Sequence, residues 1–163
     1  MMASWEPKDL ARILAQDGYA VAKGSGSPTI RSMTEMICEA TGKSVWASEW
    51  AFQKAVFDHA EALAHDHPEI ELMYAVPNGQ YRKGQRLEAG VKAGVPDIAL
   101  PVARHGYHSL YIELKILGNT RTPNQVQWAQ MLTRENNFVT CITESLDDVL
   151  ELLKWYLKGA TDA

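Results

Sequence analysis

The chain carries two apolar runs near its centre, Asp97-Ile-Ala-Leu-Pro-Val102 and His108-Ser-Leu-Tyr-Ile-Glu-Leu-Lys-Ile116. Both runs are short and rich in aliphatic side chains, which is typical of buried β-strands. Arg104-His105-Gly106 lies between them and supplies turn residues, so we expect the two runs to pair as a hairpin. Because side chains alternate along a strand, Glu113 and Lys115 are predicted to project from the same face.

Helices and further strands are predicted on both sides of this hairpin. Ser48 is a suitable N-cap for a helix of about five turns, because apolar residues recur behind it at helical spacing until His67-Pro68. Thr122-Pro123 and Ser145 mark the starts of two later helices. Apolar runs at residues 70–76 and 138–143 predict two more strands. The order of helix, three strands, helix, strand and helix indicates an α/β domain.

Length and composition favour one globular domain. The 163 residues are 46% apolar and 22% charged, with a net charge of -4, which suits a protein with a single buried core. No apolar run is long enough to cross a membrane, and the N-terminus has no signal-peptide pattern, so we expect a cytoplasmic protein. Cys38 and Cys141 lie far apart, which argues against a disulfide framework or a zinc ribbon.

The N-terminal segment, residues 1–44, is expected to be separate from the main domain. It contains two short helical patterns joined by Lys23-Gly-Ser-Gly-Ser-Pro28, a composition typical of a loop. We interpret residues 1–44 as a helical appendage that is either flexible or used in oligomerisation. Residues 45–163 then form the domain that carries the chemistry.

A local basic stretch interrupts the acidic chain between residues 78 and 94. Its cations are Arg82, Lys83, Arg86 and Lys92, against the single anion Glu88, which gives a net charge of +3. Lysine and arginine side chains neutralise the phosphates of nucleic acids, so these four residues are candidate DNA contacts. The alternative is an ordinary solvated loop.

The hairpin also brings together groups that can perform chemistry. If its strands pair, Asp97 and Glu113 converge, and carboxylate oxygens are suitable ligands for a hard divalent cation such as Mg²⁺. Lys115 beside such a metal could orient the attacking water and stabilise charge on a phosphate. The alternative is that Asp97 caps a turn and that Glu113 and Lys115 form a solvated ion pair. The apolar run around them disfavours that alternative, because unpaired charge is costly in a central strand.

The spacing of these residues resembles a known nuclease signature. Gly94-Val-Pro-Asp97, fifteen intervening residues and Glu113-Leu-Lys115 look like the PD-(D/E)XK motif. Pro77-Asn-Gly79 with Arg82, Gly90-Val-Lys-Ala-Gly-Val-Pro-Asp97, Tyr111-Ile-Glu-Leu-Lys115 and Gln125 with Trp128 resemble the VRR-NUC branch, as found in phage-type stand-alone proteins. The resemblance covers about residues 46–158. It implies a restriction-endonuclease-like core, with a mixed central sheet flanked by helices.

The resemblance also implies roles for further residues. Glu49 matches a carboxylate on the first core helix that completes the site, directly or through water. Gln125 matches a glutamine near the metal and the scissile phosphate. The backbone carbonyl of Leu114 is expected to join Asp97 and Glu113 as a metal ligand. By their residue types alone, Glu49 would be a first-turn glutamate and Gln125 an unremarkable helix residue.

From this resemblance we expect an endonuclease that hydrolyses DNA phosphodiesters with Mg²⁺ or Mn²⁺. The family resemblance favours a homodimer that acts on branched DNA such as a four-way (Holliday) junction, in a bacterial or phage-infected host cell. One alternative is a nuclease of the same fold that cuts flaps, nicked duplex or single strands. Another is a DNA-binding module that does not cleave.

Overall fold

Five strands form one mixed sheet in the parts of the chain that this computed structural model describes, residues 20–21, 41–77 and 89–158. The strand order is β1-β5-β4-β3-β2. The strands are β1 (Ala20–Val21), β2 (Tyr74–Ala75), β3 (Ile98–Leu100), β4 (Leu110–Lys115) and β5 (Phe138–Thr143). The predicted α/β fold with a mixed central sheet is thereby confirmed.

The predicted hairpin is formed by β3 and β4, which pair antiparallel with Ile98 opposite Ile112 and Leu100 opposite Leu110. β5 lies parallel to β4 and has the predicted bounds. The strand predicted at residues 70–76 is wrong over its first half, because Pro68–Leu72 forms a 3-10 helix. Proline fixes the backbone angle that starts such a turn, and only Tyr74–Ala75 remains as a short strand on β3.

The three helices of the described residues begin where the sequence predicts. α3 (Glu49–Ala60) is capped by Ser48, α4 (Pro123–Arg134) by Thr122, and α5 (Leu146–Leu157) by Ser145. Each capping hydroxyl accepts a hydrogen bond from a backbone N–H of the first turn, which would otherwise lack a partner. α3 is shorter than predicted, because the chain continues as a 3-10 helix over Glu61–His65.

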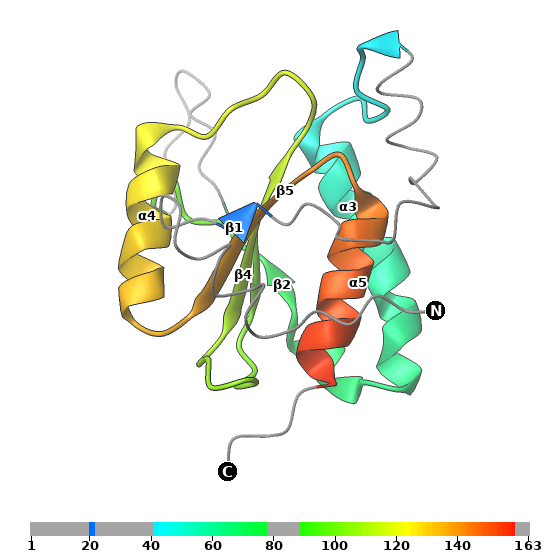
Figure 1. Cartoon of the computed structure of the whole chain (residues 1–163), viewed down its shortest axis with the longest axis vertical. Helices are drawn as coiled ribbons and strands as arrows, with labels where there is room; N and C mark the ends of the chain where they lie inside the picture. The colour runs from blue at the N-terminus through cyan, green and yellow to red at the C-terminus, as the bar shows by residue number, and fades with distance from the viewer. Residues whose placement is uncertain (1–19, 22–40, 78–88, 159–163) are drawn as a thin grey trace.

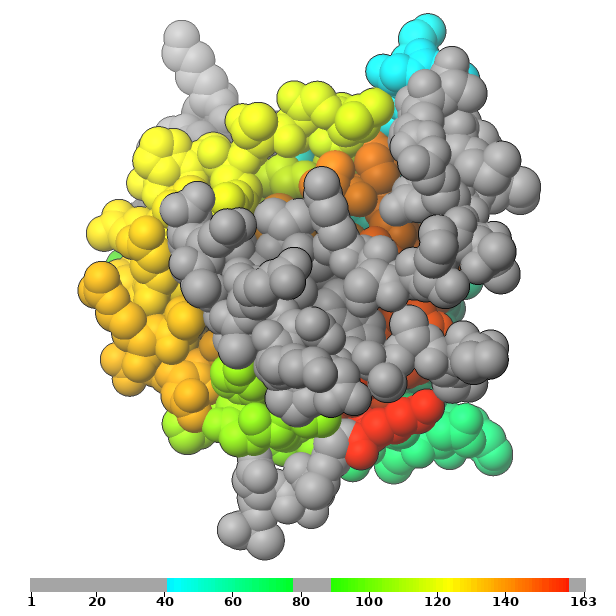
Figure 2. All heavy atoms as spheres, in the orientation of Figure 1, coloured from blue at the N-terminus to red at the C-terminus, as the bar shows by residue number. Residues whose placement is uncertain are grey.

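The helices form layers on the two sides of the sheet (Figure 1). α3 and α5 lie on one side, and α4 lies on the other. The space-filling view shows α4 as one flank of the molecule, well apart from the end of α5 (Figure 2). The larger buried cluster joins the sheet to α3 and α5 through residues such as Phe52, Leu114 and Leu153. A smaller one joins the sheet to α4 through Ala129, Val139 and Cys141.

The sheet also includes a short piece of the N-terminal segment. β1 pairs in parallel with β5, with Ala20 opposite Thr140. The predicted division into residues 1–44 and 45–163 stays a prediction, since most of the first segment lies outside the described residues. For the site, the important feature is the hairpin, because the start of β3 and the end of β4 lie at the same end of the sheet.

Candidate functional site

Glu113 and Lys115 form a buried ion pair at the end of β4. The Lys115 Nζ lies 2.6 Å from the Glu113 Oε1, and the side chains are 5% and 0% exposed. Both side chains leave the same face of the strand, as their spacing predicts. The pair is therefore not the solvated surface contact that was the alternative interpretation.

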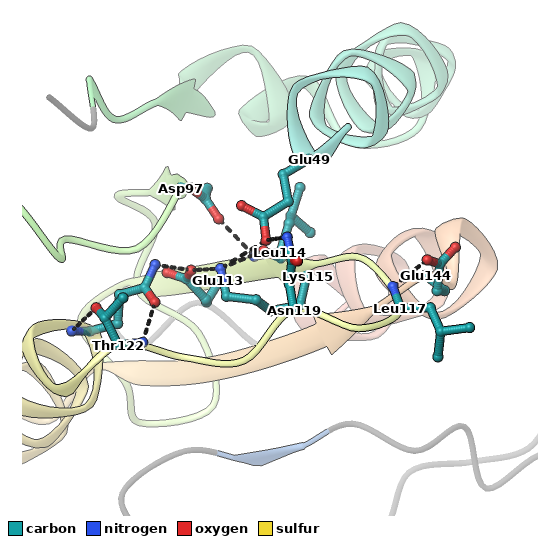
Figure 3. Close-up of polar contacts among 10 residues, drawn as sticks. Glu49, Asp97, Glu113, Leu114, Lys115, Leu117, Asn119, Thr122 and Glu144 are labelled. Carbon is teal, nitrogen blue, oxygen red and sulfur yellow. Dashed lines mark hydrogen bonds and ion pairs between the residues drawn. The ribbon is translucent and has the colours of Figure 1, made fainter. Parts of the chain in front are cut away.

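Three oxygen atoms surround the Lys115 ammonium group (Figure 3). Besides Glu113, it donates to the backbone carbonyl of Leu114 at 3.1 Å and lies 3.2 Å from the Glu49 Oε1. Glu49 is the first residue of α3, so the Ser48 cap sets where the helix begins and brings this carboxylate to the sheet. The structure thus gathers Glu113, Leu114 and Glu49 around one cationic nitrogen, and the family resemblance implies that these three residues bind one metal.

Asp97 lies next to this group, directly before β3. Its Oδ2 accepts a hydrogen bond from the Leu114 N–H at 2.8 Å. Burial, and after it the neighbouring Asp97 charge, raise the pKa of Glu113 to about 8, although Lys115 acts in the opposite direction. The negative form of Glu113 is therefore disfavoured beside the other carboxylates of the cluster, and a bound cation would favour it.

One oxygen of the cluster is left without a partner. Within the described residues, the Glu113 Oε2 is buried and makes no hydrogen bond. A buried carboxylate oxygen in this state is costly. A bound cation would remove that cost, so the donor set fits a hard divalent metal.

Gln125 reaches the cluster from the first turn of α4. Its Oε1 accepts from the Thr122 N–H at 2.8 Å, which completes a capping box. Its Nε2 donates to the Glu113 Oε1. The capping box therefore fixes the glutamine side chain, so that its amide group is held against the Glu113 carboxylate.

Gly94 controls how closely the loop before Asp97 approaches α4. It has a φ of +93°, and a Cβ added there would lie 2.7 Å from the Asn124 Cβ. Glycine meets both demands because it accepts positive φ and has no side chain. The Gly94-Val-Pro-Asp97 motif is thus packed against the helix that carries Gln125.

Sequence reasoning missed Asn119, which donates from its Nδ2 to the Glu49 Oε1 at 3.0 Å. Asn119 follows Gly118 in the chain after β4, and an asparagine beside a glycine is typical of any turn. No sequence signal marks it as a neighbour of Glu49, which lies 70 residues away.

The predicted DNA contacts are described only in part. Arg82, Lys83 and Arg86 lie outside the described residues. Lys92 is described and exposed, as a phosphate contact would need to be. Its role stays a prediction.

Two features are absent from the part of the chain that the structure describes. No group of three or more His, Cys, Asp or Glu side chains there is arranged to hold a metal ion. At the candidate site, Asp97 accepts a hydrogen bond from the Leu114 N–H, and the Glu113 and Glu49 carboxylates contact Lys115. Among the same residues, no helix is long and apolar enough to span a membrane.

Comparison with known proteins gives a similarity in structure. The solved structure of a "VRR_NUC domain protein" matches with 25% sequence identity and a TM-score of 0.44, over 62% of this chain and 87% of that one. No family model and no curated protein match the sequence. The matched protein carries the name of the family that the sequence motifs resemble. What the site can do chemically follows from its own side chains.

Proposed function

We propose that this protein is a metal-dependent endonuclease that hydrolyses phosphodiester bonds in DNA. The observation that carries the proposal is the convergence of Glu113, Glu49 and the Leu114 carbonyl on one cationic nitrogen, beside a buried carboxylate oxygen without a partner. A buried ion pair alone adds little stability. An arrangement that buries this much acidic charge suits a site that binds a cation and a phosphate.

Asp97, Glu113, the Leu114 carbonyl and Glu49 are the groups that would hold Mg²⁺ or Mn²⁺, Glu49 directly or through water. When bound, such a metal polarises a phosphoryl oxygen and lowers the pKa of a coordinated water. Metal binding requires an ionised carboxylate, so it would favour the deprotonated form of Glu113 against the effect of burial.

The remaining side chains have roles that need no metal geometry. Lys115 would hold the attacking water or stabilise negative charge on the phosphate, and its ammonium group among the acidic oxygens of the cluster supports this role. Gln125 fixes the orientation of Glu113 through its amide N–H. Burial around these groups strengthens their electrostatic effect on a phosphate.

The DNA substrate is proposed to be branched, with a four-way junction as the preferred form. A homodimer would offer two sites for two strands and would match the two-fold symmetry of a junction. Arg82, Lys83, Arg86 and Lys92 would contact DNA phosphates and make binding salt-dependent. Such a protein would act in the cytoplasm of a bacterial or phage-infected cell.

The test is cleavage of labelled four-way junction, flap, nicked, linear and single-stranded DNA with Mg²⁺, Mn²⁺ or EDTA. Wild type is compared with Asp97→Ala, Glu113→Ala and Lys115→Ala. Lys154→Ala is the matched control, because Lys154 is an exposed lysine on α5 that pairs with Glu151. We expect metal-dependent, paired cuts in the junction by wild type and the control, and none by the other three.

Each other result has a defined meaning. Preferred cleavage of flaps, nicks or single strands would keep the nuclease and change its substrate. DNA binding without any cleavage would replace it by a non-cleaving module. Normal cutting by folded Glu113→Ala protein would refute the assignment of the site.

A further inference from the structure

Glu144 lies outside the candidate site but contacts both chain segments that form it. It directly follows β5 and is 5% exposed. Its Oε1 accepts a hydrogen bond from the Leu117 N–H, which Figure 3 shows, and its Oε2 accepts one from the Val45 N–H at 3.3 Å. One carboxylate therefore bridges the segment after Lys115 and the segment before Glu49.

The backbone of Glu144 connects the same two segments. Its N–H donates to the Lys115 carbonyl at 2.9 Å. Its carbonyl accepts from the Trp46 Nε1 at 2.8 Å, and the Trp46 ring stacks on Phe52 of α3 with centroids 5.2 Å apart. The two side-chain and two backbone hydrogen bonds of Glu144 together join the end of β4 to the start of α3.

This arrangement of Glu144 costs free energy, both because a carboxylate is buried and because its φ is positive. A carboxylate loses its hydration when it is buried, and the ion pairs found within the described residues do not include Glu144. Two backbone N–H groups replace the lost water. The residue also has a φ of +64°, a conformation that non-glycine residues rarely adopt.

The two bridged segments each place a group at the site. Val45 lies four residues before Glu49, and Leu117 lies two residues after Lys115 and two before Asn119. The first segment places Glu49 at the site, and the second places Lys115 and Asn119 there. The Glu49 Oε1 lies 3.2 Å from the Lys115 Nζ and 3.0 Å from the Asn119 Nδ2. The spacing of these contacts depends on how far apart Val45 and Leu117 are held.

We propose that Glu144 is a positioning residue that fixes Glu49 against Lys115 by holding the Val45 and Leu117 N–H groups on one carboxylate. The role in catalysis rests on the proposed nuclease function. Glu144 contacts neither Glu49 nor Lys115 through its side chain, so it acts only through the backbone of the two segments.

Two variants separate the carboxylate from the backbone shape. Glu144→Gln keeps the size of the side chain, but its amide turns an NH₂ group toward one of two N–H donors. Glu144→Gly removes the carboxylate and accommodates the positive φ without steric cost. The matched control is Asp147→Asn, which removes a carboxylate charge from an exposed residue in the first turn of α5.

Single-turnover cleavage at saturating DNA is the first measurement, below the unfolding temperature of each variant. We expect both Glu144 variants to cut about 10²-fold more slowly, because a small misplacement of reacting groups costs this much. DNA affinity should stay within about twofold, and Asp147→Asn should match wild type within about twofold. The double variant Glu49→Gln/Glu144→Gln should cut less than about twofold more slowly than Glu49→Gln alone.

Amide hydrogen exchange in the full chain is the second measurement and needs no activity. The Val45 and Leu117 amides should exchange faster in both Glu144 variants and not in Asp147→Asn. A folded Glu144→Gly protein that cuts at the wild-type rate would overturn the proposal, as would an equal effect of Glu144→Gln with and without Glu49.

The two proposals fail in distinguishable ways. Wild type that cuts none of the DNAs refutes the nuclease, and the exchange data then decide whether Glu144 holds the two segments. Unchanged protection of the Val45 or the Leu117 amide in the Glu144 variants would also refute the positioning role of Glu144. Faster exchange at both amides would support Glu144 as a constraint on the spacing of Glu49 and Lys115.

Discussion

Two ion pairs of equal length lie at opposite ends of the β3–β4 hairpin. At the site end, Lys115 and Glu113 are 2.6 Å apart and 5% and 0% exposed. At the turn end, Arg104 and Glu69 are also 2.6 Å apart, but Glu69 is 37% exposed. Water can hydrate the Glu69 carboxylate but not that of Glu113. The two pairs therefore have the same length but different free-energy costs of burial.

The buried atoms that lack a hydrogen bond also differ between the two ends. Among the described residues, the atom of the turn-end pair in this state is the Arg104 Nε, a donor, whereas that of the site-end pair is the Glu113 Oε2, an acceptor. An unpartnered donor cannot bind a cation, but an unpartnered carboxylate oxygen can. The turn-end pair is explained by fastening the hairpin turn to the 3-10 helix Pro68–Leu72. The site-end pair is explained by the proposed cleavage site.

The largest difference is expected from removing the negative charge at each end. Glu113→Gln should reduce cleavage by more than about 10²-fold, because it alters a proposed metal ligand and not merely a group that orients one. Its thermal stability should stay close to that of wild type, since burial already disfavours the charged form of Glu113 and Lys115 keeps Glu49 as a partner. Glu69→Gln should cut normally and lose about 1 kcal/mol of unfolding free energy. Cleavage assays and thermal unfolding on both variants test this.

The opposite pattern would break the comparison. If Glu113→Gln unfolds while Glu69→Gln loses activity, then the site-end pair is structural.

Removing the cations should sharpen the same contrast. Lys115→Met should reduce cleavage by about 10²–10³-fold, the usual cost of losing a group that stabilises transition-state charge. Its melting temperature should also fall, because the Glu113 and Glu49 carboxylates lose their cationic partner. Arg104→Met should retain cleavage and lose about 2 kcal/mol of stability, measured by urea unfolding. A Lys115→Met protein as active as wild type would remove Lys115 from the site.

The site end was more predictable from the sequence than the turn end, for a physical reason. Asp97, Glu113 and Lys115 lie on two adjacent strands, so the alternation of side chains and one hairpin suffice to bring them together. The capping box of Thr122 and Gln125 is equally local, although only the family resemblance linked Gln125 to the site. Local periodicity and capping therefore account for the hairpin and the helix starts, whereas Glu49 and Gln125 were assigned to the site only through the family resemblance.

The contacts that the sequence did not reveal are long-range. Glu144 bonds the Val45 N–H across 99 residues, and its position after an apolar strand and before an N-cap is typical of an ordinary turn. Asn119 reaches Glu49 across 70 residues. Such contacts depend on how α3 packs on the sheet, which no local pattern specifies. The 3-10 helix at Pro68–Leu72 was missed because a short apolar run fits a strand equally well.

Glycine substitutions offer a further contrast between the two ends. Gly94 and Gly106 have φ values of +93° and +79°, so alanine is strained at both. An added Cβ at Gly94 would also lie 2.8 Å from the Asn124 backbone carbon, whereas at Gly106 nothing lies within 4 Å. Gly106→Ala should cost about 1 kcal/mol. Gly94→Ala should cost about 3 kcal/mol because the start of α4 must also move.

The two glycine variants should also differ in cleavage activity. Gly94→Ala should also slow cleavage under folded conditions, because its loop leads to Asp97 and its neighbour Asn124 precedes Gln125. Gly106→Ala should cut like wild type. Equal unfolding free energies for the two variants, measured in urea, would show that the close approach at Asn124 does not matter.

The smallest effect is expected from one neutral hydrogen bond on the side of the core away from the site. The buried Tyr156 hydroxyl donates to the Val102 carbonyl at 2.8 Å, which links α5 to the chain after β3. Tyr156→Phe keeps the ring packed in the core and should lose about 1 kcal/mol, which lowers the melting temperature by about 2–4 °C. Cleavage should not change, because neither Tyr156 nor Val102 contacts the site. A loss of activity without a loss of stability would mean that the two ends of the hairpin are coupled, so that the turn end does more than fasten the fold.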